Sequence, residues 1–205
     1  IRSLYESEST LGKLFPLQLK KVELLGWIAE TIQKNGSIFE EHTLEEKTLH
    51  EDPKINETLK KIYKFDKEFM LEDFLKGAKK AFEFIIGNYV DGKTEELKRL
   101  LSNKMFETFK SQIVKRQKKG EELSITFIGV NLPKLINAEM YNSSFARMKL
   151  EFITEQVQTI KSSSGKIIDG DINQILNITE IWTFTKNMKD KNPNWILEKI
   201  EESAA

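Results

Sequence analysis

The sequence lacks residues on which many active sites and metal centres depend. Its 205 residues include no cysteine, which excludes disulfides, thiolate metal ligands and cysteine nucleophiles. The only histidines are His42 and His50, and both stand in an N-terminal stretch with many acidic residues. The zinc-binding pattern HExxH and the nucleophile pattern GxSxG are also absent. We therefore expect neither a bound metal ion nor a cofactor.

Long hydrophobic runs and a net charge are lacking as well. No stretch approaches the roughly 18 uninterrupted apolar residues of a membrane span, so we expect a soluble chain without such a span. Thirty-two basic residues balance 32 acidic ones, so the chain as a whole does not attract nucleic acid, and DNA is not an expected partner. What the sequence does have is 39% hydrophobic residues with 13 phenylalanines, enough for one sizeable core.

The character of the sequence changes near residue 60. Residues 1–62 form an N-terminal extension, in which aliphatic side chains recur at helical spacing between residues 22 and 32. Residues 35–57 are rich in acidic side chains, which is typical of a solvated linker. Residues 63–205 are expected to form the folded domain.

Residues 66–92 predict a long amphipathic helix. Aromatic and aliphatic side chains recur there at offsets of three and four, and Gly92 supplies a left-handed stop. Because Gly92, Lys93 and Thr94 follow a helix rather than a strand, we interpret them as a helix break and not as a nucleotide site. Thr94 can cap a short second helix, and Ser102 can cap a third, which Gly120 ends.

Strand candidates follow these helices. Four lie at residues 122–130, 145–160, 175–187 and 194–200, and a shorter one runs from 135 to 140. Between residues 145 and 152 apolar side chains alternate with charged ones, as an antiparallel sheet that is covered on one face requires. Helices followed by a meander of strands predict an α+β fold.

These elements carry a resemblance to a known family. The stretches FLKGAKKAFEFIIGNYVDGKTEELKRLLS, KRQKKGEEL, ITEIWTF and KNPNWIL, in this order, resemble the Tim44-like domain over about residues 66–202. The resemblance implies a cone similar to nuclear transport factor 2 (NTF2-like), with N-terminal helices packed on a curved antiparallel β-sheet and a hydrophobic pocket between them. It also implies a membrane-peripheral scaffold rather than a catalyst. Lys93 departs from the family, whose members more often have an acid there.

The aromatic residues of the predicted sheet and helices allow two interpretations. One is ordinary core packing, and the other is a partly open pocket that admits an acyl chain or an apolar side chain of a partner. The candidate pocket residues are Phe82, Phe109, Phe152, Trp182, Phe184 and Glu180. Trp195, after a Pro-Asn turn, is expected to pack against the neighbouring strand.

Glu180 is the one candidate for acid–base chemistry. It shares a strand face with Trp182, and desolvation beside that ring would raise the pKa of its carboxyl. No histidine stands near it in sequence. Pairing with Arg147 or a lysine across the sheet, or accepting backbone hydrogen bonds at a β-bulge, would account for it without catalysis. We therefore expect a protein that is not an enzyme, and the alternative is a pocket isomerase or dehydratase that uses Glu180.

Local basic charge is the remaining functional signal. Residues 93–119 carry nine basic side chains against three acidic ones, seven lysines lie between residues 60 and 80, and we expect both groups to form one basic end. One interpretation of these charges is an ordinary solvated helix surface. The other is binding to an anionic partner: a basic residue near an anionic membrane contributes roughly 1 kcal/mol, and RNA phosphates would use the same charges. The pattern at residues 59–82 sets apolar side chains beside lysines. The candidate lipid-binding residues are Lys60, Lys61, Lys64, Lys67, Ile62, Phe65 and Phe69.

The expected function is that of a non-enzymatic scaffold at the inner face of an energy-transducing membrane. It would bind anionic phospholipid and recruit protein partners to a site of protein translocation or membrane-complex assembly. A ribosome-tethering, RNA-associated module is the alternative within the binding class. The expected location is the cytoplasmic side of a bacterial inner membrane or the matrix side of a mitochondrial one.

Overall fold

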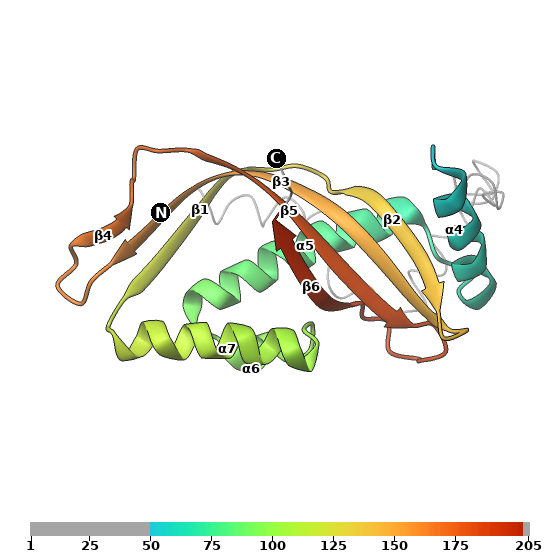
Figure 1. Ribbon diagram of the computed structural model, residues 1–205, viewed down its shortest axis with the longest axis horizontal. Coiled ribbons are helices and arrows are strands. Elements are labelled where there is room, and N and C mark those ends of the chain that lie inside the picture. The colour runs from blue at the N-terminus through green and yellow to red at the C-terminus, as the bar shows by residue number, and fades with distance from the viewer. Residues whose placement is uncertain (1–49, 203–205) are drawn as a thin grey trace, which may run out of the picture. The chain divides into compact units, whose positions relative to one another are not determined.

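The computed structural model describes residues 50–202, and helices precede strands as the sequence predicts (Figure 1). The helices are α4 (Pro53–Phe65), α5 (Leu71–Asp91), α6 (Thr94–Leu97) and α7 (Asn103–Lys118). The strands are β1 (Glu122–Val130), β2 (Lys134–Tyr141), β3 (Phe145–Lys161), β4 (Ile167–Gly170), β5 (Leu176–Asn187) and β6 (Ile196–Glu202). The predicted α+β class is confirmed. The amphipathic segment at residues 22–32 and most of the acidic linker lie outside the described residues.

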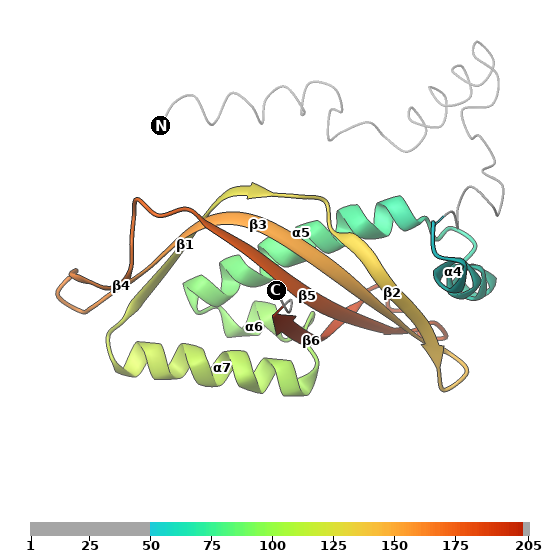
Figure 2. The ribbon, with the colours of Figure 1, turned by 45° about the horizontal axis from the view of Figure 1, so that its top comes forward.

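One curved antiparallel sheet contains all six strands, in the order β1-β3-β5-β6, with β2 and β4 also paired to β3. β1 pairs with the C-terminal half of β3 and β2 with its N-terminal half, so both follow the same edge of that strand (Figure 2). The register shifts between Phe127 and Gly129 and again between Leu135 and Asn137. Such bulges bend a strand and increase its twist, which fits the curvature of the sheet over the helices.

The helix ends follow the predicted signals with one exception. Gly92 has a φ of 72°, and the Lys93 N–H donates to the Asn88 carbonyl at 2.9 Å, which closes the end of α5. Ser102 Oγ accepts the Met105 N–H at 3.3 Å, so the predicted cap of α7 is confirmed. The predicted cap at Thr94 is wrong. The chain re-enters a helix directly after the turn at Gly92, which makes Lys93 the cap residue and Thr94 the first residue of α6.

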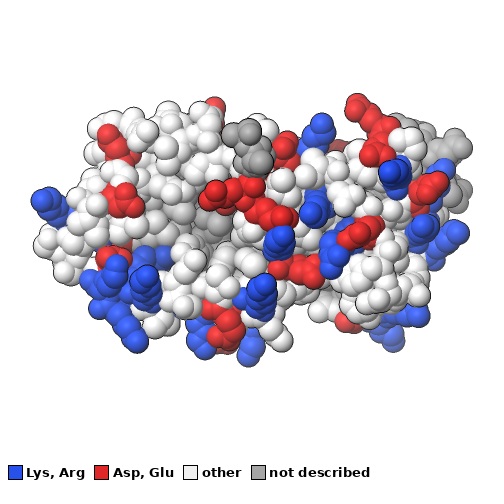
Figure 3. Space-filling view, in the orientation of Figure 1, with Lys and Arg blue, Asp and Glu red and all other residues white. Residues whose placement is uncertain are grey.

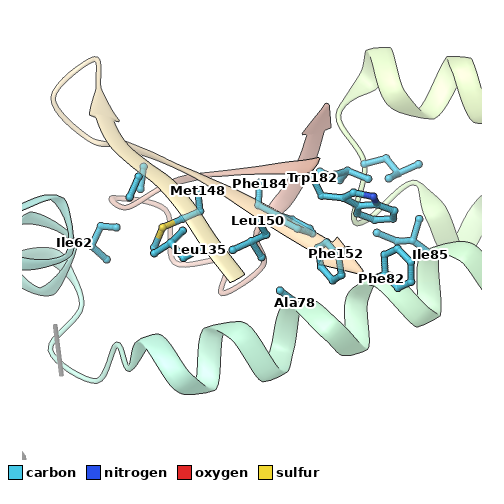
Figure 4. Close-up of a cluster of buried hydrophobic side chains, with 14 of the residues drawn as sticks. Ile62, Ala78, Phe82, Ile85, Leu135, Met148, Leu150, Phe152, Trp182 and Phe184 are labelled. Carbon is cyan, nitrogen blue, oxygen red and sulfur yellow. The ribbon is translucent and has the colours of Figure 1, made fainter. Parts of the chain in front are cut away.

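The core lies between α5 and the inner face of the sheet. Ala78, Phe82 and Ile85 point from α5 toward the strands, with Phe152 and Trp182 opposite them (Figure 4). The inward row of β3, which is Ala146, Met148, Leu150 and Phe152, is buried as the alternation predicts. Complete burial stabilises the fold by about 1.5 to 3 kcal/mol for a large apolar side chain, so this row fixes which face of the sheet the helices cover.

Helix α4 packs against β2 rather than against α5. Its buried side chains are Ile55, Thr58, Leu59 and Ile62, and Thr58 Oγ1 donates to the Ala138 carbonyl of β2 at 3.2 Å. The predicted boundary between residues 62 and 63 falls inside this helix, whose apolar face belongs to the same hydrophobic core as the sheet. Across residues 50–202, no helix is both long and apolar enough to span a bilayer.

Candidate functional site

A cavity of about 520 Å³ lies between helices α5 and α7 and the inner face of the sheet. Small-molecule sites in proteins are commonly of this size. The helices contribute Phe82, Ile86, Tyr89, Phe109, Gln112, Lys115 and Arg116, and the turn after α7 contributes Lys119 and Glu121. The strands contribute Leu123, Ile125, Gln156, Gln158, Ile160, Ile178, Glu180 and Ile200. The cavity is therefore apolar for the most part, with amides and a few charges among the hydrocarbon.

Three of the six predicted pocket residues line this cavity, namely Phe82, Phe109 and Glu180. The other three, Phe152, Trp182 and Phe184, are buried in the core behind it. Phe82 joins the two groups, because its ring stacks on Phe152 with centroids 4.7 Å apart and lies 4.7 Å from the ring of Trp182. The core and pocket interpretations thus each describe part of one aromatic cluster. Trp195 packs on Phe74 of α5 at 4.8 Å, away from this cavity.

Sequence reasoning missed the amides of the cavity. The inward row of β3 changes from apolar residues to Thr154, Gln156 and Gln158 in its C-terminal half. Gln156 is nevertheless buried, and its Oε1 accepts the Thr154 hydroxyl at 3.4 Å. Polar side chains in an inward-facing row indicate that this part of the strand lines a cavity rather than the hydrophobic core. This pattern in β3 was the sequence signal that could have revealed the amides.

Glu180 lies on the cavity wall beside the core. Its Oε2 accepts the indole Nε1–H of Trp182 at 3.2 Å. Burial raises the pKa of the Glu180 carboxyl, the Trp182 hydrogen bond opposes this, and the carboxylate of Glu202 on the facing position of β6 adds to the rise. The predicted direction of the pKa shift is confirmed.

Of the non-catalytic roles that the sequence allowed for Glu180, pairing with Arg147 is wrong. Side chains alternate along β3, so Arg147 points to the outer face of the sheet while Phe152, the cross-strand partner of Glu180, points inward. Arg147 instead donates from Nε to Glu198 at 2.8 Å and from Nη1 to Glu139 at 2.7 Å.

Two of the three basic residues around the cavity are engaged with the protein itself. Arg116 donates to the carbonyls of Tyr89 and Val90 at 2.7 and 3.0 Å, so it caps the C-terminal end of α5. Lys119 forms an ion pair with Glu121 at 3.2 Å. Lys115, the third, is exposed. The rim is basic, but most of this charge already has a structural partner.

The segment GNYVDGKT, residues 87–94, has the spacing of a phosphate-binding loop. The structure supports the sequence interpretation of a helix break, because Gly87 to Asp91 belong to α5 and Gly92 is its cap. Lys93 Nζ pairs with Asp91 at 2.7 Å. A phosphate loop follows a strand and turns its backbone N–H groups toward the ligand, whereas these N–H groups are used within the helix and its cap.

The predicted lipid-binding residues fall into two groups. Lys60, Lys61, Lys64 and Lys67 are exposed, as is Phe65 with 42% of its surface accessible. Ile62 and Phe69 are only 0% and 7% exposed, which corrects their expected contact with lipid. Both belong to the hydrophobic core, because the apolar stripe of α4 faces β2 and the ring of Phe69 packs 6.0 Å from that of Phe74. We call Lys60, Lys61, Lys64 and Phe65 the α4 surface.

The sequence predicts that the basic residues form one basic end, but the structure places them in two separate regions. α4 lies beyond β2, whereas the basic C-terminal turn of α7 lies at the other end of the sheet, where β1 begins (Figures 1 and 2). In the space-filling view, basic side chains occur near both ends of the described part, and basic and acidic side chains are interspersed between them (Figure 3). Residues 93–119 therefore do not extend the α4 surface.

Comparisons with known proteins bear on this fold and site. The family model of the Tim44-like domain matches residues 55–202. No curated protein matches the chain. Among solved structures, the crystal structure of the intermembrane space region of chloroplast protein ARC6 is similar at 12% identity and a TM-score of 0.43, covering 62% of this chain and 96% of that one. Since the family match takes in most of α4, the cavity and every strand, the chain belongs to the Tim44-like domain family.

Proposed function

We propose that the protein is a non-enzymatic, membrane-peripheral scaffold, which binds anionic phospholipid through the α4 surface and recruits protein partners for translocation or membrane-complex assembly. The proposed location is the cytoplasmic face of a bacterial inner membrane or the matrix face of a mitochondrial one. The observation that carries this proposal is the two-sided character of α4, one face of which is fixed in the core while the other presents lysines.

Packing of the apolar face of α4 against β2 fixes which of its side chains face the solvent. Ile55, Leu59 and Ile62 are buried, so the helix cannot turn its apolar stripe toward a membrane without losing core contacts. Membrane contact therefore falls to the α4 surface, where electrostatic attraction is worth roughly 1 kcal/mol for each lysine near an anionic headgroup. Phe65 ends the helix and supplies one exposed ring for the interface.

The charges of the α4 surface are available to a ligand. In the part of the chain that the structure describes, no ion pair involves Lys60, Lys61 or Lys64. Glu57 is the one acidic residue within α4 and reduces the local excess of positive charge by one. Three unpaired lysines on one helix face can meet several headgroups at once.

The environment of Glu180 supports the non-enzymatic part of the proposal. Its hydrogen-bond partner is the indole of Trp182, a group that does not exchange protons with a substrate at neutral pH. The other acid of the cavity, Glu121, is paired with Lys119 at the rim. Tim44-like domains are also generally non-enzymatic.

The test is cosedimentation of the purified chain with liposomes. The chain should bind vesicles rich in phosphatidylglycerol or cardiolipin and not neutral phosphatidylcholine, and salt should weaken binding because exposed charges are screened within about 8 Å near 0.15 M. The variant Lys60→Glu/Lys64→Glu should bind at least about tenfold more weakly, since two attractive contacts become repulsive.

The matched control is Lys189→Glu/Lys191→Glu, which changes the net charge equally but in the exposed β5–β6 loop. This variant should bind like the unchanged chain. Equal loss in both variants, or equal binding to neutral vesicles, would show that the α4 surface is not the lipid site. Binding of RNA but of no vesicle would favour the ribosome-tethering alternative.

A further inference from the structure

The cavity contains an acidic side chain, Glu180, that has no role in the proposed binding of lipid. Glu180 Oε2 accepts one hydrogen bond, from Trp182 Nε1 at 3.2 Å, whereas a carboxylate offers about four acceptor positions. Glu180 takes part in no ion pair within residues 50–202. Because it also lines the cavity, its remaining acceptor positions are available to a group that enters there.

A second carboxylate near Glu180 makes the electrostatic potential on this part of the cavity wall negative. Glu202 stands opposite it on β6, and directly opposed residues of an antiparallel pair share a face. Lys115, Arg116 and Lys119 also line the cavity. Arg116 is hydrogen-bonded to the carbonyls of Tyr89 and Val90, Lys119 is paired with Glu121, and Lys115 is exposed. Within residues 50–202, Glu202 is the only charged residue that contributes to the raised pKa of the Glu180 carboxyl, so a ligand group beside Glu180 meets the negative charge of these two carboxylates.

The walls next to Glu180 are suited to a hydrocarbon stem. Ile125, Ile160 and Ile178 come from three adjacent strands, and Phe82 faces them from α5. Gln156 and Gln158 add amide oxygens and N–H groups to the same wall. Apolar walls around a carboxylate and amides complement a side chain with a hydrocarbon stem and a cationic tip, and lysine and arginine are built this way.

From this arrangement we infer that the cavity binds a lysine or arginine side chain of a partner protein, next to an apolar residue of that partner, with Glu180 as the counter-charge. The inference deepens the proposed function, on which it rests for the existence of a protein partner. A buried ion pair is favourable when both groups are also hydrogen-bonded, and Trp182, Gln156 and Gln158 provide such groups. An acyl chain, one of the two ligands that the open-pocket interpretation of the sequence allows, would leave the carboxylate against hydrocarbon.

The first experiment uses small probes and the NMR signal of the Trp182 indole N–H, assigned with the Trp27→Phe and Trp195→Phe variants. Hexylamine should shift this signal to saturation, and hexanoate should not. Glu180→Gln keeps an oxygen for the indole bond but removes the charge. It should weaken hexylamine binding at least about tenfold and leave the binding of hexan-1-ol unchanged. Glu202→Gln removes an equal charge outside the cavity and should have a smaller effect.

The second experiment separates a protein side chain from a free amine. The peptide acetyl-Leu-Lys-Leu-amide should bind at least as tightly as hexylamine, and acetyl-Leu-Gln-Leu-amide about tenfold more weakly. Exclusion of the lysine peptide while hexylamine binds would overturn the inference, as would equal binding of hexanoate or an unaffected Glu180→Gln variant. That variant should still cosediment with anionic liposomes, so failure of this inference and failure of the lipid surface are distinguishable.

Discussion

At the scale of single residues, Glu180 is a group that folding places at an energetic disadvantage when charged. Burial and the facing carboxylate of Glu202 oppose ionisation of the Glu180 carboxyl, whereas the one hydrogen bond from the Trp182 indole favours it. In the unfolded chain the carboxyl has its ordinary pKa near 4.5, below that in the folded protein. Between those two pKa values the folded state holds more protons than the unfolded state. Stability therefore falls as the pH rises through this window, and the cost persists above it.

Glu180→Gln should remove this pH-dependent cost. At pH 4 the carboxyl is protonated in most molecules of both states, so the variant and the unchanged chain should have nearly equal free energies of unfolding. At pH 8 the variant should be the more stable one. Urea unfolding followed by circular dichroism at both pH values measures the difference.

Glu202→Gln serves as the control for this prediction, because it removes the repulsion but not the burial of Glu180. Its gain at pH 8 should be the smaller of the two, since burial is the larger cause of the raised pKa. A Glu180→Gln variant that is less stable at pH 8 would mean that the folded protein stabilises the charge through a partner.

At the scale of elements, α7 depends on its first turn for its position. Ser102 Oγ caps the helix, and the Ser102 N–H donates to the Leu197 carbonyl of β6 at 2.9 Å, so one residue both starts the helix and ties it to the sheet. Residues from α7 then form the outer side of the cavity. The cap thus contributes to the shape of the candidate site without touching it.

Ser102→Ala should reduce the free energy of unfolding by about 1 kcal/mol, which is typical for loss of a capping hydroxyl. Thr94→Ala is the matched change at the start of α6, where no side-chain cap bond exists, and its effect should stay within about 0.5 kcal/mol. Both values follow from urea unfolding curves. Equal losses would contradict the assigned difference between the two helix starts.

The elements also show which features the sequence could predict. The alternation around Trp182 and Phe184 and the stop at Gly92 are local signals, and the structure follows both. β4 was missed because it has only four residues, of which Asp169 and Gly170 disfavour strands, and because it depends on pairing with β3. Gly170 permits that pairing, since a Cβ there would lie 2.1 Å from the Gln158 carbonyl oxygen.

The candidate site was predictable only in part, for a similar reason. Facing rings such as Phe82 and Trp182 can be found from periodicity, because each lies on a regular element. Whether a ring borders a cavity or the dry core depends on how far α7 stands from the sheet, and no short stretch of sequence determines that distance. The buried face of α4 was likewise taken for a lipid-facing one, since periodicity reveals an apolar stripe but not what covers it.

At the scale of the whole molecule, α4 is part of the sheet domain by its contacts. A chain shortened to residues 63–205 would lose the burial of Ile55, Leu59 and Ile62 and expose their partners on β2. Each of these side chains stabilises the fold by about 1.5 to 3 kcal/mol. We therefore expect this shortened chain to melt at a lower temperature and to bind a hydrophobic dye.

A chain of residues 50–205 is the control, because it keeps α4 together with His50, whose Nε2 lies 3.2 Å from the Leu135 carbonyl oxygen. It should melt close to the full chain. Equal melting of the two shortened chains would show that α4 is an appendage and that the domain begins after it. Thermal unfolding with dye fluorescence gives both readings.

The long strand β3 also has a consequence for how the chain folds. It takes part in four of the five strand pairings within residues 50–202, and two of these, with β1 and with β5, join residues 20 to 42 positions apart in sequence. β1 and β2 both pair with one edge of β3, and β5 pairs with the other edge. These strands therefore cannot pair in their native register until β3 is extended. Such non-local pairing slows folding, because loop-closure entropy is lost before contacts compensate for it. We expect the rate-limiting barrier to be crossed with β3 already in place, while α4 joins afterwards.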